Sequence, residues 1–139
     1  MAPRLDLALT TGPAAARAHE RGVTLLVDGH AAAAVAAFRD AIAEDPCFAL
    51  GFVALAVALA ELRDDVSEMA VDPLVGAGRC RRRLSRGERH HLEVVRLVLG
   101  DRWARAEVLG REHLAEFPDD ALVRHVLARR RDERDRSIR

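Results

Sequence analysis

The densest group of side chains able to do acid–base or metal chemistry is formed by Glu88, His90, His91 and Glu93. Imidazole exchanges protons near neutral pH and is a common metal ligand, and carboxylates can assist either chemistry. Adjacent histidines point in different directions on a helix, however, whereas metal sites on a single helix use histidines at i and i+4. The main expectation for this group is a surface or packing role, with metal binding or acid–base work as the alternative.

Two other sets of residues carry weaker signals. His113 and Glu116 stand at i and i+3 and could bind a metal weakly, but surface pairing is the better interpretation. The arginine run at 79–83 could contact phosphates, and a solvated helix end is the simpler interpretation. Four aromatic residues at helical spacing are expected in the core: Phe38, Phe48, Trp103 and Phe117. The sequence therefore predicts no catalytic residue, no metal site and no cofactor.

Composition narrows the class of protein. The chain has 139 residues, half of them hydrophobic, and 22 basic residues balance 22 acidic ones. This length allows one domain with a modest core, and the neutral charge gives no case for nucleic acid or a membrane as partner. There is no glycine-rich phosphate loop, no GxSxG motif and no Ser/His/Asp set in the sequence.

The cysteines and the apolar runs indicate in which cellular compartment the protein is expected. Cys47 and Cys80 have no CxxC or histidine-spaced partner motif, so reduced thiols are expected. The first residues lack the pattern of an export signal. The longest nearly uncharged run, residues 46–60, is shorter than the roughly 20 residues that span a bilayer. We expect a soluble, cytoplasmic protein in which this run forms a buried helix.

Hydrophobic periodicity and helix-end signals predict an all-α protein. Pro13 favours a helix start, Gly29 a helix end, and Asp45-Pro46 both an end and a new start. Ser85 and Glu88 fit a capping box, and Asp119 or Asp120 can cap the last helix. The predicted helices are 13–28, 30–44, 47–62, a broken segment around Asp72-Pro73, 85–99, 102–117 and 120–128, between an arm at 1–12 and a charged tail at 129–139.

An internal repeat organises these helices. Pro46 and Pro118 are 72 residues apart, and Gly29 corresponds to Gly100 if one residue is inserted. That spacing leaves room for an intervening unit, since two-helix repeats have a period of about 34 residues. The predicted units are 15–48, 49–84 and 86–118, followed by the capping helix 120–128, within one domain at 13–128.

These residues resemble the tetratricopeptide repeat family. The resemblance is clearest over 15–48, where the family's small, aromatic and terminating positions are occupied by Gly22, Gly29, Ala34, Phe38, Ala41 and Pro46. Departures are Ala18 and Arg21 in the first unit and Gly110 and His113 in the third. The segment SRGERHHLEVVRLVLGDRWARAEVLGREHLAEFPDDALVRHVLA also looks like the first part of a tetratricopeptide repeat protein 38-like protein. The implied fold is a short α-α superhelix of about three helical hairpins plus a C-terminal capping helix.

The resemblance implies a concave groove lined by the first helix of each unit. The positions carried over from the family are Ala16, His19, Val23, Leu26, Leu50, Val53, Val57, Ala60, Glu88, His91, Val95 and Val98. Family members that clamp a partner's carboxylates use lysine and asparagine there, and this sequence contains neither. The groove is mostly apolar, which suits an amphipathic helix, a hydrophobic small molecule or a second copy of the chain.

The leading functional hypothesis is a non-enzymatic scaffold that binds a partner protein through a helix or an apolar segment. The alternative is a small-molecule-binding protein or small enzyme with His19, Glu88 and His91 at the mouth of the same groove. A homodimer is a third option, because a short array leaves end helices uncovered.

Overall fold

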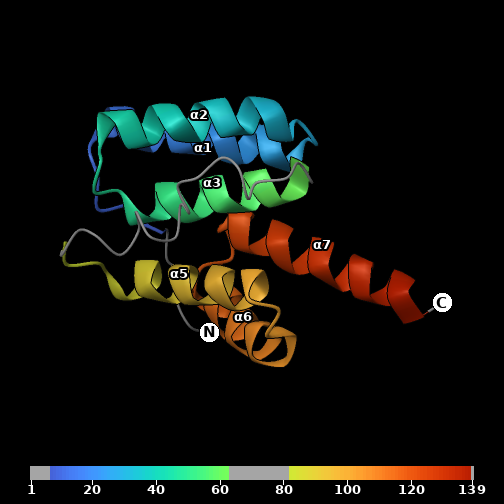
Figure 1. Cartoon of the computed structure of the whole chain (residues 1–139). Helices are drawn as coiled ribbons and strands as arrows, with labels where there is room; N and C mark the ends of the chain where they lie inside the picture. Colours follow the sequence, from blue (N-terminus) through green and yellow to red (C-terminus); the bar gives the residue numbers. More distant parts are fainter. Residues whose placement is uncertain (1–6, 63–81, 139) are drawn as a thin grey trace. The chain divides into compact units, whose positions relative to one another are not determined.

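The computed structural model describes residues 7–62 and 82–138, and every regular element in these two ranges is a helix (Figure 1). The predicted all-α class is confirmed. The helices are α1 (Pro13–Val27), α2 (Ala31–Glu44), α3 (Ala49–Leu62), α5 (Arg86–Leu99), α6 (Trp103–Glu116) and α7 (Ala121–Ile138). The predicted broken helix around Asp72-Pro73 lies outside the described residues.

The described residues belong to two compact units. One contains residues 9–62 and 82–85, and the other contains 7–8 and 86–138. In the first, α1 packs along α2 and α2 along α3; in the second, α5, α6 and α7 pack on one another. Helical hairpins are therefore present as predicted. The superhelix and the single domain at 13–128 stay predictions.

A glycine allows the first hairpin to close tightly. A Cβ atom added to Gly22 on α1 would lie 2.4 Å from the ring of Phe38 on α2. Phe38 is fully buried, as are Leu26 and Leu50. The aromatic ring thus occupies the volume that the missing side chain leaves, as the small and aromatic positions of the repeat predict.

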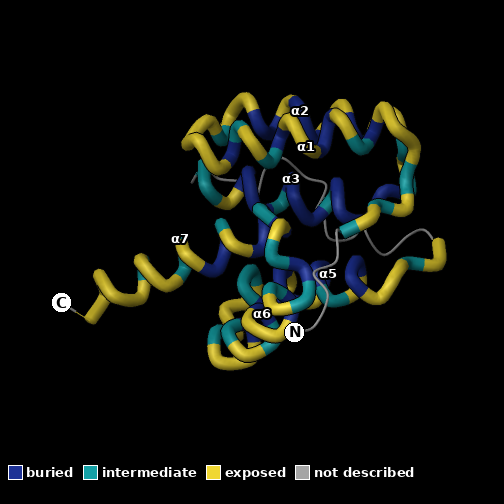
Figure 2. The backbone as a smooth tube through the Cα atoms, turned by 180° about the vertical axis from the view of Figure 1, so that it is seen from behind, coloured by how far each residue is buried: buried dark blue, intermediate teal, exposed yellow. Residues whose placement is uncertain are grey.

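The α3 helix is apolar on nearly all sides, and nine of its 14 residues are buried. Figure 2 shows the buried segments of the backbone in dark blue, and α3 carries many of them. In the turn before α3, Cys47 is disulfide-bonded. The expectation of a reduced thiol at this position is wrong, and Cys80, the other cysteine, lies outside the described residues.

The turns of the two hairpins match residue for residue at a spacing of 72. His30 donates its N–H to the Leu25 carbonyl at 2.8 Å, and Arg102 donates to the Leu97 carbonyl at 2.8 Å. The left-handed positions are Gly29, with φ of 87°, and Asp101, with φ of 58°. Asp101, and not Gly100, is therefore the partner of Gly29, and no residue is inserted. Aspartate adopts the left-handed conformation more readily than most residues. An alignment of glycine with glycine therefore does not pair Gly29 with Asp101.

The α7 helix continues to Ile138, through the segment predicted as a charged tail. Its first turns supply the buried residues Leu122, Val123, Val126 and Leu127, and the rest is stabilised by charge pairs. Arg129 and Arg130 pair with Glu133, one helical turn away. Arg131 and Arg134 lie 6.0 and 5.8 Å from the ring centre of Trp103, which is half-buried.

None of the helices in the described ranges combines the length and the apolar character needed to cross a membrane.

Candidate functional site

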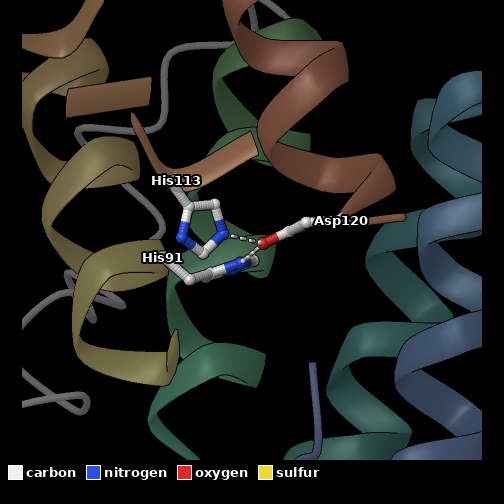
Figure 3. Close-up of side chains that lie close together, drawn as sticks. All are labelled: His91, His113 and Asp120. Carbon is white, nitrogen blue, oxygen red and sulfur yellow. Dashed lines mark hydrogen bonds and ion pairs between the residues drawn. The ribbon is translucent and has the colours of Figure 1, made fainter. Parts of the chain in front are cut away.

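Three buried polar side chains meet inside the second unit. His91 from α5 and His113 from α6 point toward Asp120, which directly precedes α7 (Figure 3). His91 Nδ1 and His113 Nε2 each lie 2.7 Å from the same oxygen, Asp120 Oδ2. Residues 22 and 29 positions apart in the sequence thus converge on one atom. We call these three residues the His–Asp–His cluster.

Helix-end chemistry places Asp120. Its second oxygen, Oδ1, accepts a hydrogen bond from the Val123 N–H at 3.2 Å, the bond of an N-cap residue. This confirms the predicted cap at Asp119 or Asp120 and assigns it to Asp120. Because one carboxylate oxygen is held by the start of α7, the other is fixed in place for the two imidazole rings.

The cluster is almost completely shielded from solvent. His91 and His113 are each 1% exposed and Asp120 is 5% exposed. Burial is the largest single influence on the pKa of Asp120 and raises it. The charge of His91 and hydrogen bonds from both histidines and from the Val123 N–H outweigh it together, and the pKa lies well below its usual range. Asp120 is therefore a carboxylate at neutral pH.

Each imidazole ring has one nitrogen that faces Asp120 and one that faces away from it. A carboxylate can only accept, so His91 Nδ1 and His113 Nε2 must each carry the hydrogen that Asp120 receives. His91 Nε2 and His113 Nδ1 are buried and have no hydrogen-bond partner among the residues that the structure describes. The ring of His113 also stacks on Phe117, with centres 5.1 Å apart. Both rings thus bond to Asp120 through one nitrogen, while their other nitrogens have no partner among the described residues.

This arrangement can do two kinds of chemistry in principle. The three residues can hold a metal ion, because one ligand atom from each lies within 4.8 Å of the other two. Acid–base catalysis would instead need a substrate in contact with an imidazole ring, and the burial of both rings excludes that in this conformation. The geometry therefore favours binding of an ion over turnover of a substrate.

The predicted groove residues are mostly covered. Eight of the twelve are buried: His19, Leu26, Leu50, Val53, Val57, Glu88, His91 and Val95. Three are half-buried and one is exposed: Ala16, Val23, Val98 and Ala60. They are divided between the two units. The groove stays a prediction, and the buried positions would have to become accessible to touch a partner.

The other residues that the sequence singles out as candidate site residues lie outside the His–Asp–His cluster. His19 lies in the first unit, with its ring centre 5.6 Å from that of Phe38 and 5.2 Å from that of Phe48. His90 lies outside the cluster, with its ring centre 6.3 Å from that of His113. The predicted pairing partner of His113, Glu116, bonds to Arg86 instead, and this contact lowers the pKa of the Glu116 carboxyl.

One member of the arginine run takes a structural role. Arg82 donates to Asp45 Oδ1 at 2.9 Å and to the Thr10 carbonyl at 2.9 Å. The hydrogen bond from Arg82 is the main reason why the pKa of Asp45 falls from 3.8 to about 2. Arg82 thus closes an ion pair within the first unit where the sequence predicts only a solvated helix end.

A shallow hollow lies between α5 and α6 on the outside of the second unit. Its volume is about 470 Å³, and its lining is formed by Glu93, Leu97, Ala104, Arg105, Val108, Leu109 and Glu112. Val108 is 60% exposed, which is unusual for a large apolar side chain. The hollow is separate from the groove positions and was not predicted from the sequence.

No protein-family model matches the chain, and no curated protein or solved structure matches it. The resemblance to the tetratricopeptide repeat family stays a prediction that rests on the residues quoted for it.

One signal for the cluster combines the repeat with the fold of the first unit. Shifting by 72 residues aligns His91 with His19 and Asp120 with Phe48. Since His19 contacts Phe48 in the folded first unit, the repeat register then indicates that His91 contacts Asp120. His113 takes the place of the buried Ala41. A search for ligands on one helix could not find three residues that belong to three helices.

Proposed function

We propose that this protein is an interaction module, a helical scaffold that binds a helix or an apolar segment of another protein. The observation that carries the proposal is the repeated hairpin, in which turns 72 residues apart share the same backbone hydrogen bonds. Proteins built from repeated helical hairpins present extended surfaces to partners, and their hairpins serve as a frame for those surfaces.

The hollow between α5 and α6 gives this proposal a specific contact surface. Leu97, Val108 and Leu109 provide an apolar floor, and the charged residues of the lining are Glu93, Arg105 and Glu112. An amphipathic helix matches this pattern, because its apolar face can cover the floor while its charged residues pair with those of the lining. The hollow is open in the structure, whereas most of the predicted groove positions are buried.

The exposure of Val108 makes a clean test available. Val108→Glu places a charge in the hollow without disturbing the core, and Ala36→Glu is a matched control, since Ala36 is the exposed residue 72 positions earlier. We expect proteins captured by the wild-type chain from its native cells to be lost with Val108→Glu and retained with Ala36→Glu. Equal capture by all three chains would contradict a role for the hollow.

The small-molecule or enzyme alternative has less support from the geometry. It places His19, Glu88 and His91 at the mouth of a groove, and all three are buried. A homodimer remains compatible with the hollow, because a second copy could cover Val108. Light scattering over a range of concentrations distinguishes the two occupants: a monomer at all concentrations leaves a different protein as the partner.

A cytoplasmic location also stays a proposal. The disulfide at Cys47 weighs against it, because the cytoplasm keeps most protein thiols reduced. Thiol labelling of the protein inside its native cells decides the question, and a labelled Cys47 would support the cytoplasm.

A further inference from the structure

We infer that the His–Asp–His cluster is a binding site for a divalent transition-metal ion, with Zn²⁺ as the ion that fits its ligands best. His91, His113 and Asp120 come from three different helical segments, and both imidazole nitrogens lie 2.7 Å from one carboxylate oxygen. A metal ion bound there would join α5, α6 and the start of α7. This site is independent of the interaction role proposed above.

The distances require side-chain adjustment at each ligand. Zn²⁺ binds nitrogen and oxygen at about 2.0 to 2.1 Å, so two ligands of a tetrahedral ion lie about 3.3 Å apart. The nitrogen-to-oxygen separations are 2.7 Å in the structure, and the two ligating nitrogens lie within 4.8 Å of each other. An ion that replaces the two hydrogen bonds thus needs each nitrogen-to-oxygen separation to widen by about 0.6 Å and the two nitrogens to lie about 3.3 Å apart, which rotations of the side chains can supply.

The ligand set selects the class of ion. Two imidazoles and one carboxylate suit Zn²⁺ and neighbouring transition metals, while Ca²⁺ and Mg²⁺ prefer six or more oxygen ligands. The ion would also place positive charge beside the carboxylate of Asp120, which is 5% exposed. It would replace the two imidazole donors that now offset the desolvation of this carboxylate.

The first unit shows that the repeat does not need this cluster. The residues at the positions of His113 and Asp120 are Ala41 and Phe48, and both are buried there as core residues. Two polar groups in the second unit therefore replace side chains that pack without any desolvation cost. Polar residues that are unfavourable for packing and converge on one point are typical of a binding site.

Protons must move when the ion binds. Each ring currently donates a hydrogen to Asp120, and a coordinating nitrogen must offer its lone pair instead. A neutral ring then carries its hydrogen on the opposite nitrogen, His91 Nε2 or His113 Nδ1, neither of which has a partner among the described residues. A protonated ring releases one proton. Acid should therefore weaken metal binding.

The first experiment uses the unmodified chain. Protein stripped with a chelator is titrated with Zn²⁺ while the imidazole nitrogen-15 shifts of all six histidines are followed by NMR. We expect one ion per chain and shifts at His91 and His113, with His30 and His125 unchanged. Unchanged shifts at His91 and His113 in excess Zn²⁺ would overturn the proposal, and so would shifts confined to other histidines.

The second experiment removes single ligands. Asp120→Asn retains the shape of the side chain and a cap acceptor, and His113→Ala installs the residue that the first unit has at this position. Each variant should bind Zn²⁺ at least about 100-fold more weakly in calorimetry, as expected for the loss of a direct ligand. His90→Ala is the matched control, because His90 is adjacent to His91 but outside the cluster, and it should bind as tightly as the wild type.

Folding is checked separately, by circular dichroism of each stripped variant. Co²⁺ provides a further readout, since an ion held by the cluster gives visible absorption bands in the wild type and in His90→Ala that are absent in Asp120→Asn. Tight binding to a folded Asp120→Asn variant would place the ion elsewhere on the chain and contradict the site.

Discussion

The two helical units use the same backbone plan around opposite kinds of interior. In the first, His19 contacts the rings of Phe38 and Phe48. In the second, its counterpart His91 bonds to Asp120, which stands where the first unit has Phe48. The comparison shows that the hairpin itself tolerates either an apolar or a polar centre. The polar centre is therefore a property of the second unit and not a requirement of the fold.

The helix contacts differ in the same way. Phe38 fills the space above Gly22 in the first hairpin, and its counterpart in the second unit is Gly110. Gly110 receives Leu127 from α7 instead, with Leu127 Cδ1 2.5 Å from where a Cβ would lie. The volume that one unit fills from its own hairpin is filled in the other by the next helix. This brings the start of α7, and with it Asp120, against the hairpin.

Exchanging the two centres should have the largest effect. Phe48→Asp places the carboxylate of the second unit in the first, where His19 contacts this position but Ala41 stands in place of the second histidine. A buried charge that has only one of its two histidine partners, together with a lost aromatic side chain, should destabilise the first unit by about 4 kcal/mol or more. Urea unfolding followed by circular dichroism measures this. Adding Ala41→His should restore part of the loss, and an unchanged midpoint for Phe48→Asp would refute the matched register.

Acid should weaken the first unit through Asp45. The ion pair with Arg82 lowers the pKa of Asp45 from 3.8 to about 2, so folding favours the carboxylate. The resulting stability is complete above about pH 4 and is lost as the pH falls through 2, by on the order of 2 kcal/mol. Thermal unfolding between pH 5 and 2 measures the loss. Arg82→Gln should flatten this dependence, and a variant with the wild-type pH profile would exclude the ion pair as its cause.

The two tight glycines should respond unequally to a methyl group. In Gly22→Ala the new Cβ meets the buried ring of Phe38, and in Gly110→Ala it meets the end of the Leu127 side chain. A buried ring yields less than a leucine terminus, so we expect about 2 kcal/mol for Gly22→Ala and about 1 kcal/mol for Gly110→Ala. Denaturant titration of both variants tests the order, and the reverse order would show that α7 is the more rigid neighbour.

The smallest effect is expected at the turns. Gly29→Ala puts a side chain at φ of 87° and should cost about 1 kcal/mol, whereas Asp101→Gly relieves a residue already at φ of 58°. The second change also removes the Asp101–Arg130 ion pair, so its net effect should be close to zero. Melting temperatures provide the measurement. A clearly lower melting temperature of Asp101→Gly would show that the ion pair contributes more to stability than the relief of backbone strain.

The sequence predicts the helices well because their ends are marked by local chemistry. Pro13 starts α1, Gly29 follows its end, and Asp120 caps α7, each by an interaction within a few residues. The sequence does not predict the extension of α7 to Ile138, because the tail has no apolar stripe. Its ion pairs, such as Arg129 with Glu133, support a helix only once the first turns are packed.

Short-range spacing and periodicity predict the all-α class, most helix ends and a repeat of 72 residues. That His91, His113 and Asp120 share one point emerges only when the helices pack. Their convergence depends on how three helices pack, and on a glycine at 110 that admits Leu127 and α7. Contacts between distant segments leave no pattern in the neighbouring residues, so the chemistry of this protein became visible only in the folded chain.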